Sequence, residues 1–223
     1  MLRAIVFDLD GVLIDSEPLM RFAFEAVYRD FIGGGTPPIE SYLEHMGESF
    51  PRIMDKLGLP HTLWEPYRAL CQRHVDHIRL FPGSRDFLER ASAVGLQMGI
   101  LTGKDRLRTL QILEHFDLGR FFQVVVASDE LRNPKPHPEG ILCVLDRLGC
   151  RAAEALMVGD SVNDILCAQQ AGVKAAAVTW GIKPERLRTL CRPDYLASDW
   201  GSLWQFVLDM GGDSGAPREP AAV

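Results

Sequence analysis

The chain has 223 residues, a formal net charge of -6 and 47% hydrophobic residues, which fits one substantial core with an inserted element or two small domains. Its acidic balance, without a lysine- or arginine-rich run, argues against nucleic-acid and anionic-membrane partners. No apolar run approaches the roughly 20 residues of a membrane span. The five scattered cysteines and the lack of a secretory signal pattern at the start favour a cytoplasmic protein with reduced thiols.

The first predicted strand, residues 4–7, is an apolar run that breaks into Asp8-Leu9-Asp10. Such a run is typical of a parallel sheet covered on both faces, and open α/β sheets place their ligands at the carboxyl ends of the strands. Two carboxylates one residue apart repel each other unless a cation or a proton lies between them. We interpret the pair as a carboxylate nucleophile beside an acid/base partner, with a divalent metal. A turn with two solvated aspartates before Gly11 is the alternative.

The pattern changes from helices to alternating strands and helices along the chain. A helix is expected from Ser16 to about Phe31, and further helices are expected at 39–46, 50–57 and 62–79, with no strand between 15 and 80. Strands then follow at 97–101, 124–127, 155–158 and 174–178, and helices at 84–94, 105–116, 138–148 and 163–171. We therefore predict an α/β core from residues 1–14 and 81–210 and a helical lid from 15–80. Residues 211–223 should form a flexible tail.

Three later junctions place polar residues at predicted strand ends. Thr102-Gly103-Lys104 offers a hydroxyl and free N–H groups for an anion, although for this segment taken alone an ordinary loop before a helix is the more common explanation. Lys135 lies between two prolines, which hold a lysine in place at low entropic cost, yet a solvated lysine is the more common finding in a proline-rich loop. Asp160 and Asp164 follow the strand at 155–158, where helix capping by Ser161 or Asn163 would not account for two aspartates.

All four junctions lie at the same edge of one predicted parallel sheet, and their residue types fit phosphoryl transfer. Asp8, Asp160 and the backbone carbonyl of Asp10 are hard oxygen ligands that suit Mg²⁺. Thr102 and Lys135 can hold the remaining phosphate oxygens while Asp8 attacks phosphorus and Asp10 protonates the leaving oxygen.

The motifs Asp8-x-Asp10-Gly11, Thr102-Gly103, Lys135-Pro136 and Gly159-Asp160-x-x-x-Asp164 resemble, in order and spacing, those of the haloacid dehalogenase superfamily. The resemblance covers residues 4 to about 180 and implies a Rossmann-like parallel sheet with a small helical cap. It also implies an aspartyl-phosphate on Asp8, an acid and base role for Asp10, phosphate binding by Thr102, charge neutralisation by Lys135 and magnesium ligation by Asp160 with support from Asp164.

Within that superfamily the chain looks most like the phosphoglycolate phosphatase and β-phosphoglucomutase group. The segment 37–60 also resembles phosphatases associated with 3-amino-5-hydroxybenzoate biosynthesis, which would imply an aminosugar-like or small polyol phosphate. We expect a magnesium-dependent phosphatase for a small phosphorylated metabolite, acting as a monomer or weak homodimer. A phosphomutase and a catalytically silent binding module remain as alternatives. Three residues of the predicted cap, His45, Glu48 and Arg52, are candidates for substrate contact, although each is equally well explained as a surface charge.

Overall fold

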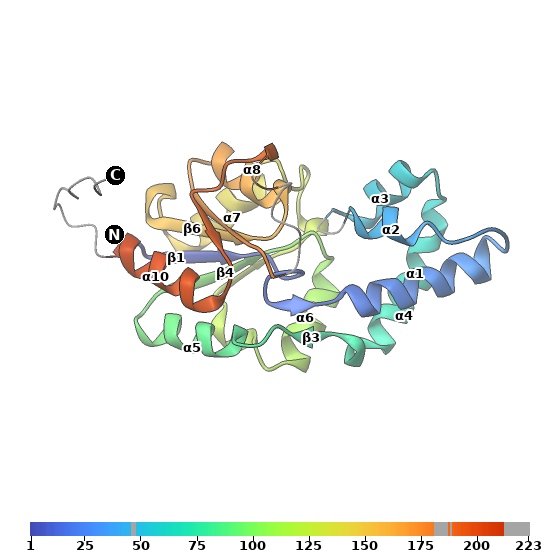
Figure 1. The fold of residues 1–223 in the computed structure, drawn as a ribbon, viewed down its shortest axis with the longest axis horizontal. Helices are drawn as coiled ribbons and strands as arrows, with labels where there is room; N and C mark the ends of the chain where they lie inside the picture. Colours follow the sequence, from blue (N-terminus) through green and yellow to red (C-terminus); the bar gives the residue numbers. More distant parts are fainter. Residues whose placement is uncertain (46–47, 181–186, 188, 212–223) are drawn as a thin grey trace, which may run out of the picture.

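The computed structural model describes residues 1–45, 48–180, 187 and 189–211, and its centre is a six-stranded parallel sheet. The strand order is β5-β4-β1-β6-β7-β8, and the central strands β4, β1 and β6 are labelled in Figure 1. The strands are β1 (Ala4–Phe7), β4 (Gln97–Leu101), β5 (Val124–Val126), β6 (Ala155–Gly159), β7 (Lys174–Val178) and β8 (Tyr195–Ala197). Because β1 pairs in parallel with both β4 and β6, the carboxyl ends of these three strands are neighbours.

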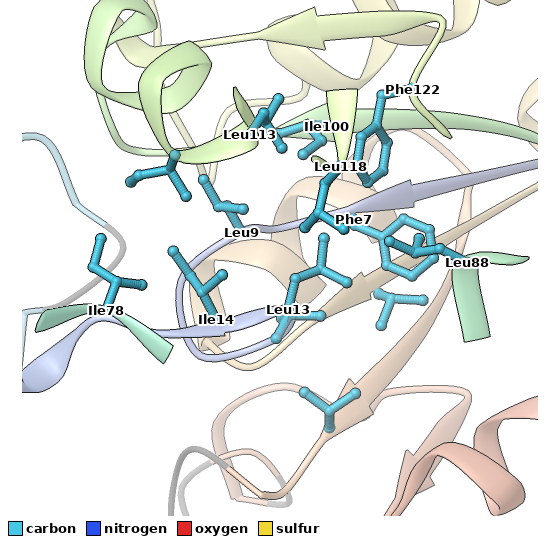
Figure 2. Close-up of a cluster of buried hydrophobic side chains, with 14 of the residues drawn as sticks. Phe7, Leu9, Leu13, Ile14, Ile78, Leu88, Ile100, Leu113, Leu118 and Phe122 are labelled. Carbon is cyan, nitrogen blue, oxygen red and sulfur yellow. The ribbon is translucent and has the colours of Figure 1, made fainter. Parts of the chain in front are cut away.

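Strand β1 is apolar at every position because helices cover both faces of the sheet. Ile5 and Phe7 pack into one apolar cluster, and Ala4 and Val6 pack into the other, as the two-residue period of a strand requires. The first face is covered by α5 (Ser84–Ala93), α6 (Arg106–His115) and α10 (Trp200–Gly211), and the second by α7 (Glu139–Leu148) and α8 (Val162–Gln170). Figure 2 shows Leu9 and Leu13, from the loop after β1, and the next residue, Ile14, in the same cluster as Phe7.

Four helices, which we call the cap helices, gather at one end of the molecule beyond the sheet (Figure 1). They are α1 (Glu17–Phe31), α2 (Ile39–Leu43), α3 (Phe50–Leu57) and α4 (Trp64–Arg73). Their aromatic residues pack against one another and are continuous with the apolar cluster on the first face of the sheet. The rings of Phe24 and Tyr42 stack with centroids 4.2 Å apart, and the hydroxyls of Tyr42 and Tyr67 lie 2.7 Å from each other.

The structure confirms the α/β class and places each predicted strand and helix between residues 84 and 178 within one residue of its expected ends. Gly172 directly follows α8 and its C-cap Ala171 with a φ of 69°, as expected for the residue after a helix. None of the helices among the described residues is both long and apolar enough to cross a membrane.

Two expectations about the segment before residue 81 were wrong. Strand β2 (Ile14–Asp15) pairs antiparallel with β3 (Arg79–Leu80), although no strand was expected between 15 and 80. Two-residue strands are too short to give an alternating pattern, so sequence periodicity does not detect them. The helix expected over 62–79 is α4 alone, because the chain leaves the helical conformation at His74 and continues as the short 3₁₀ helix η2 (Val75–His77). The pairing of β2 with β3 therefore holds together the two segments through which the chain enters and leaves the cap helices.

The sequence analysis also missed β8 and α10, which complete the sheet edge and one helical layer. Strand β8 has only three residues. The start of α10 does carry a signal that the sequence analysis did not use, because Asp199 directly precedes the helix and its Oδ1 accepts from the N–H of Ser202 at 2.8 Å. Gly211, assigned to the tail, is the last residue of α10; residues 212–223 lie outside the described residues.

Candidate active site

The four polar junctions of the sequence meet at the carboxyl edge of the sheet. Asp8 follows β1, Thr102 follows β4 and Asp160 follows β6, while Lys135 comes from the loop between β5 and α7. Backbone hydrogen bonds continue the ladder into this edge: the N–H of Asp8 donates to Val158 O at 2.9 Å. The four site residues are buried, with exposures of 1% for Asp8, 1% for Thr102, 4% for Lys135 and 4% for Asp160.

Lys135 is the positive charge at the centre of this cluster. Its Nζ lies 3.1 Å from Oδ1 of Asp8 and 2.6 Å from Oδ1 of Asp164, and it donates to the carbonyl of Leu101 at 3.2 Å. Burial opposes the charged form, but the attraction of Asp164 and Asp8 outweighs it and raises the pKa of Lys135 above its ordinary value. Lys135 is therefore a permanent cation beside the proposed nucleophile.

Asp164, in the first turn of α8, has both carboxylate oxygens occupied. Oδ2 accepts from the N–H of Ser161 at 3.0 Å and from its hydroxyl at 2.6 Å, while Oδ1 faces Lys135. The capping by Ser161 that the sequence offered as an alternative is present alongside the buried aspartates. Gly159 permits this approach, because a Cβ there would lie 2.2 Å from Cβ of Asp164.

The carboxylates of Asp8, Asp160 and Asp164 carry more negative charge than Lys135 alone can balance. Their ligand oxygens lie within 4.8 Å of one another. Burial, with Asp164 and Asp10 nearby, raises the pKa of Asp8 to about 7 although Lys135 lowers it; burial, Asp164 and Asp8 likewise raise the pKa of Asp160 well above its ordinary value. Among the described residues, Oδ2 of Asp8 is a buried oxygen without a hydrogen-bond partner. An unbalanced oxygen cluster with an unpartnered oxygen fits a hard divalent cation.

The carboxylate of Asp10 is held by two residues that sequence reasoning left out of the site. Its Oδ1 accepts a short hydrogen bond from the Ser16 hydroxyl and lies 3.2 Å from Nζ of Lys104, and Asp10 and Lys104 are both buried. Lys104 directly follows Thr102-Gly103 at the end of β4, so its position at a strand end was the available signal. Ser16 precedes α1, which made a helix cap the simpler interpretation of its hydroxyl.

Arg108 on α6 joins the sheet domain to the cap helices and was also missed. Its guanidinium pairs with Asp105 and lies over the rings of Trp64 and Tyr67, at 4.9 Å and 5.5 Å from their centroids. Burial opposes its charge, but neighbouring groups, including Asp105, raise the pKa of Arg108 above its ordinary value. A buried cation against two aromatic rings contributes to the contact between the cap helices and the core.

The three candidate cap residues do not lie together. His45 and Glu48 line a cavity of about 240 Å³ that also reaches Asp160, and Lys56, which sequence reasoning missed, lies in the same wall. Nζ of Lys56 is 2.6 Å from Oε1 of Glu48. Arg52 does not line this cavity; its Nη1 contacts the carbonyl oxygen of Lys135 at 3.5 Å.

A second, smaller cavity of about 30 Å³ lies between the cap helices and the Asp10 side of the site. Asp10, Gly103, Lys104 and Arg108 line it from the core, and Glu48 lines it from the cap side. Glu48 therefore borders both cavities, which makes it a cap residue with access to either side of the site.

Comparison with known proteins places the chain in a family. The model of the haloacid dehalogenase-like hydrolases matches residues 5–178. The pyrophosphatase PpaX of Bacillus pumilus is 33% identical over 92% of this chain and 96% of its own length. The phosphoglycolate phosphatase of Salmonella choleraesuis is 31% identical over 91% of each chain. These relatives give no support to the resemblance to 3-amino-5-hydroxybenzoate-associated phosphatases.

A solved structure shows the same architecture. A hydrolase of the haloacid dehalogenase-like family from Streptococcus pneumoniae superposes with a TM-score of 0.81 at 25% identity, over 92% of this chain and 98% of the other. The residues matched by the family model include all four junctions at the sheet edge. The chain belongs to the haloacid dehalogenase-like hydrolases.

Proposed function

We propose that the protein is a magnesium-dependent phosphatase that hydrolyses a small phosphorylated metabolite in the cytoplasm through an aspartyl-phosphate on Asp8. The observation that carries the proposal is the buried cluster in which Lys135 bridges Asp8 and Asp164 while Oδ2 of Asp8 has no hydrogen-bond partner among the described residues. A buried carboxylate whose charge is offset by a lysine, and which has one oxygen without a hydrogen-bond partner, is suited to use one oxygen as a nucleophile and the other as a ligand for a cation.

In the first step, a carboxylate oxygen of Asp8 forms a bond to phosphorus as the bond between phosphorus and the leaving oxygen breaks. Asp10 donates a proton to that leaving oxygen, which departs as an alcohol or acid. Lys135 offsets the negative charge near the phosphoryl group. Thr102 Oγ1 accepts from the N–H of Lys104 at 3.2 Å, so the hydroxyl proton of Thr102 is available to a phosphoryl oxygen.

In the second step, water attacks phosphorus of the aspartyl-phosphate while Asp10 takes a proton from it, which regenerates the carboxylate of Asp8 and releases inorganic phosphate. Asp10 thus ends the cycle in its starting protonation state. The burial of Asp8 and Asp10, at 1% and 8% exposure, limits the water that reaches the intermediate.

A Mg²⁺ ion would be held by Asp8 and Asp160 together with the backbone carbonyl of Asp10. Asp164 would support the site without ligating strongly, because its two oxygens already meet Lys135 and Ser161. When bound, the ion supplies positive charge to the oxygens of the phosphoryl group. Gly11 leaves room for this arrangement, since a Cβ there would lie 1.8 Å from Oδ2 of Asp160.

The substrate is expected to be small, because the cavity beside Asp160 has a volume of about 240 Å³. His45, Glu48 and Lys56 would contact the part of the substrate that is not transferred. Two relatives are named for phosphoglycolate and for pyrophosphate, so these are the first compounds to test. The role of Arg52 would be indirect, through the backbone of the Lys135 loop.

The test is phosphate release from a panel of phosphoglycolate, pyrophosphate, hexose phosphates and aminosugar phosphates, with Mg²⁺ present and with Asp8→Asn as the inactive control. We expect turnover of one class and none with the variant. Release by Asp8→Asn, or none by the wild type with any compound, would contradict the proposal. A need for a bisphosphate activator, with an isomeric phosphate formed in place of free phosphate, would identify a phosphomutase.

A further inference from the structure

Lys104 is a buried cation that the proposed reaction leaves without a task. Its side chain is 7% exposed, and its Nζ lies 3.2 Å from Oδ1 of Asp10. The backbone around it is fixed, because its N–H donates to Thr102 Oγ1 at 3.2 Å and its carbonyl accepts from Ser128 N at 3.0 Å. An ammonium group on such a fixed base holds its partner in a defined place.

Oδ1 of Asp10 has a second hydrogen-bond donor, the hydroxyl of Ser16. Ser16 immediately precedes α1, yet its hydroxyl makes no cap for that helix and donates to Oδ1 of Asp10. One oxygen of the carboxyl group thus meets a donor from the β4–α6 loop and a donor from the start of the cap helices. Since both partners donate, this oxygen is unsuited to carry a proton, and Oδ2 remains for proton exchange.

We infer that Lys104 is a positioning residue: it holds Oδ1 of Asp10 so that Oδ2 faces the leaving oxygen. The inference rests on the proposed role of Asp10 as acid and base. Other charged groups at the small cavity have partners of their own, since Arg108 pairs with Asp105 and Glu48 with Lys56. Among the described residues that line this cavity, Lys104 is therefore the cation that pairs with Asp10.

The leaving group of the substrate gives the test. An alkyl phosphate needs a proton on its departing oxygen, whereas p-nitrophenyl phosphate releases a stable anion and needs almost none. The quantity to measure is kcat/KM, which reports the steps through the first phosphoryl transfer. For Lys104→Met we expect kcat/KM for an alkyl phosphate to fall by about 30-fold or more, and that for p-nitrophenyl phosphate by less than about 3-fold.

Two further variants separate positioning from other effects. Lys104→Arg keeps a cation beside Oδ1 and should restore much of the alkyl phosphate rate. Lys174→Met removes an exposed lysine of β7 that is not among the residues placed at the site, and it should leave kcat/KM for both substrates unchanged. If Lys104→Met is poorly folded, the double variant Asp10→Asn with Lys104→Met removes both charges and should fold. Its kcat/KM for the alkyl phosphate should equal that of Asp10→Asn alone, because Lys104 then has no carboxylate to position.

The outcomes are distinct from those of the proposed function. An equal fall of kcat/KM for both substrates in Lys104→Met would show a binding role and overturn the inference, as would the absence of any fall. In both cases the wild type would still release phosphate and Asp8→Asn would not. Loss of wild-type activity on every substrate would instead contradict the proposed function itself.

Discussion

Nζ of Lys135 lies 3.1 Å from Oδ1 of Asp8, so that a loop beyond the edge of β5 supplies the charge that faces the central strand β1. Both side chains are almost fully buried, at 3% and 1% exposure. Desolvation makes isolated charges costly, and the pair is stable because Asp164 adds a second contact to the same ammonium group.

Replacing Lys135 should destabilise the protein as well as stop the reaction. In Lys135→Met three buried carboxylates face one another without the ammonium group, and removal of one partner of a buried ion pair costs about 3–5 kcal/mol. Urea unfolding monitored by circular dichroism should show this loss, with Lys174→Met as the exposed control on β7. A Lys135→Met protein that is as stable as the control would contradict the view that Lys135 balances the cluster.

Removing divalent ions should abolish phosphate release, and adding Mg²⁺ should restore it. Asp160→Asn should need at least about 10-fold more Mg²⁺ for half of full activity, because it loses a charged oxygen ligand. Calorimetric titration of Mg²⁺ checks the binding separately from turnover. Among the described residues His74, Asp76 and His77 form the other group that could hold a metal, so His77→Ala is the matched control. Equal Mg²⁺ requirements in wild type and Asp160→Asn would refute the assignment.

Metal-free protein should lose stability as the pH rises towards neutrality. Burial, reinforced by Asp164 and Asp10, raises the pKa of Asp8 from 3.8 to about 7, so the folded state holds this proton more tightly than the unfolded state. The contribution is fully present below pH 3.8 and is lost as the pH rises through about 7. The free energy of unfolding of wild type should therefore fall relative to Asp8→Asn across this window when measured with a chelator. Parallel curves for the two proteins would show that Asp8 does not titrate there.

Gly11→Ala should be far more harmful than an alanine at another glycine with positive φ. Gly11 has a φ of 74° and a Cβ there would overlap Oδ2 of Asp160 at 1.8 Å, whereas Gly58 has a φ of 64° and open space around it. Gly58→Ala should cost about 1–2 kcal/mol from backbone conformation alone. Gly11→Ala should exceed this in urea unfolding and should also weaken Mg²⁺ binding. Similar costs at the two positions would mean that Asp160 can move aside freely.

Prediction from sequence worked best where a strand or helix is long and its pattern repeats. The alternation after residue 81 predicted the strands and helices between residues 84 and 178, in their order along the chain and with their ends, because apolar strands and amphipathic helices have different periods. Strands β2 and β3 could not be found this way, because each has only two residues and depends on pairing with a distant partner. Ile14 pairs with Leu80, 66 positions away, and Asp15 pairs with Arg79, 64 positions away. The cap helices were expected, but their contact through Arg108 was not.

The sequence by itself determined that Asp8, Thr102, Lys135 and Asp160 stand at the ends of strands or in a stiff loop, and parallel pairing then requires them to share one edge. Only the tertiary structure decided which oxygen faces which cation. Lys104 reaches Asp10 and Lys135 reaches Asp8 because of side-chain directions and the depth of burial. Such contacts join residues about a hundred positions apart, and local patterns carry no information about them.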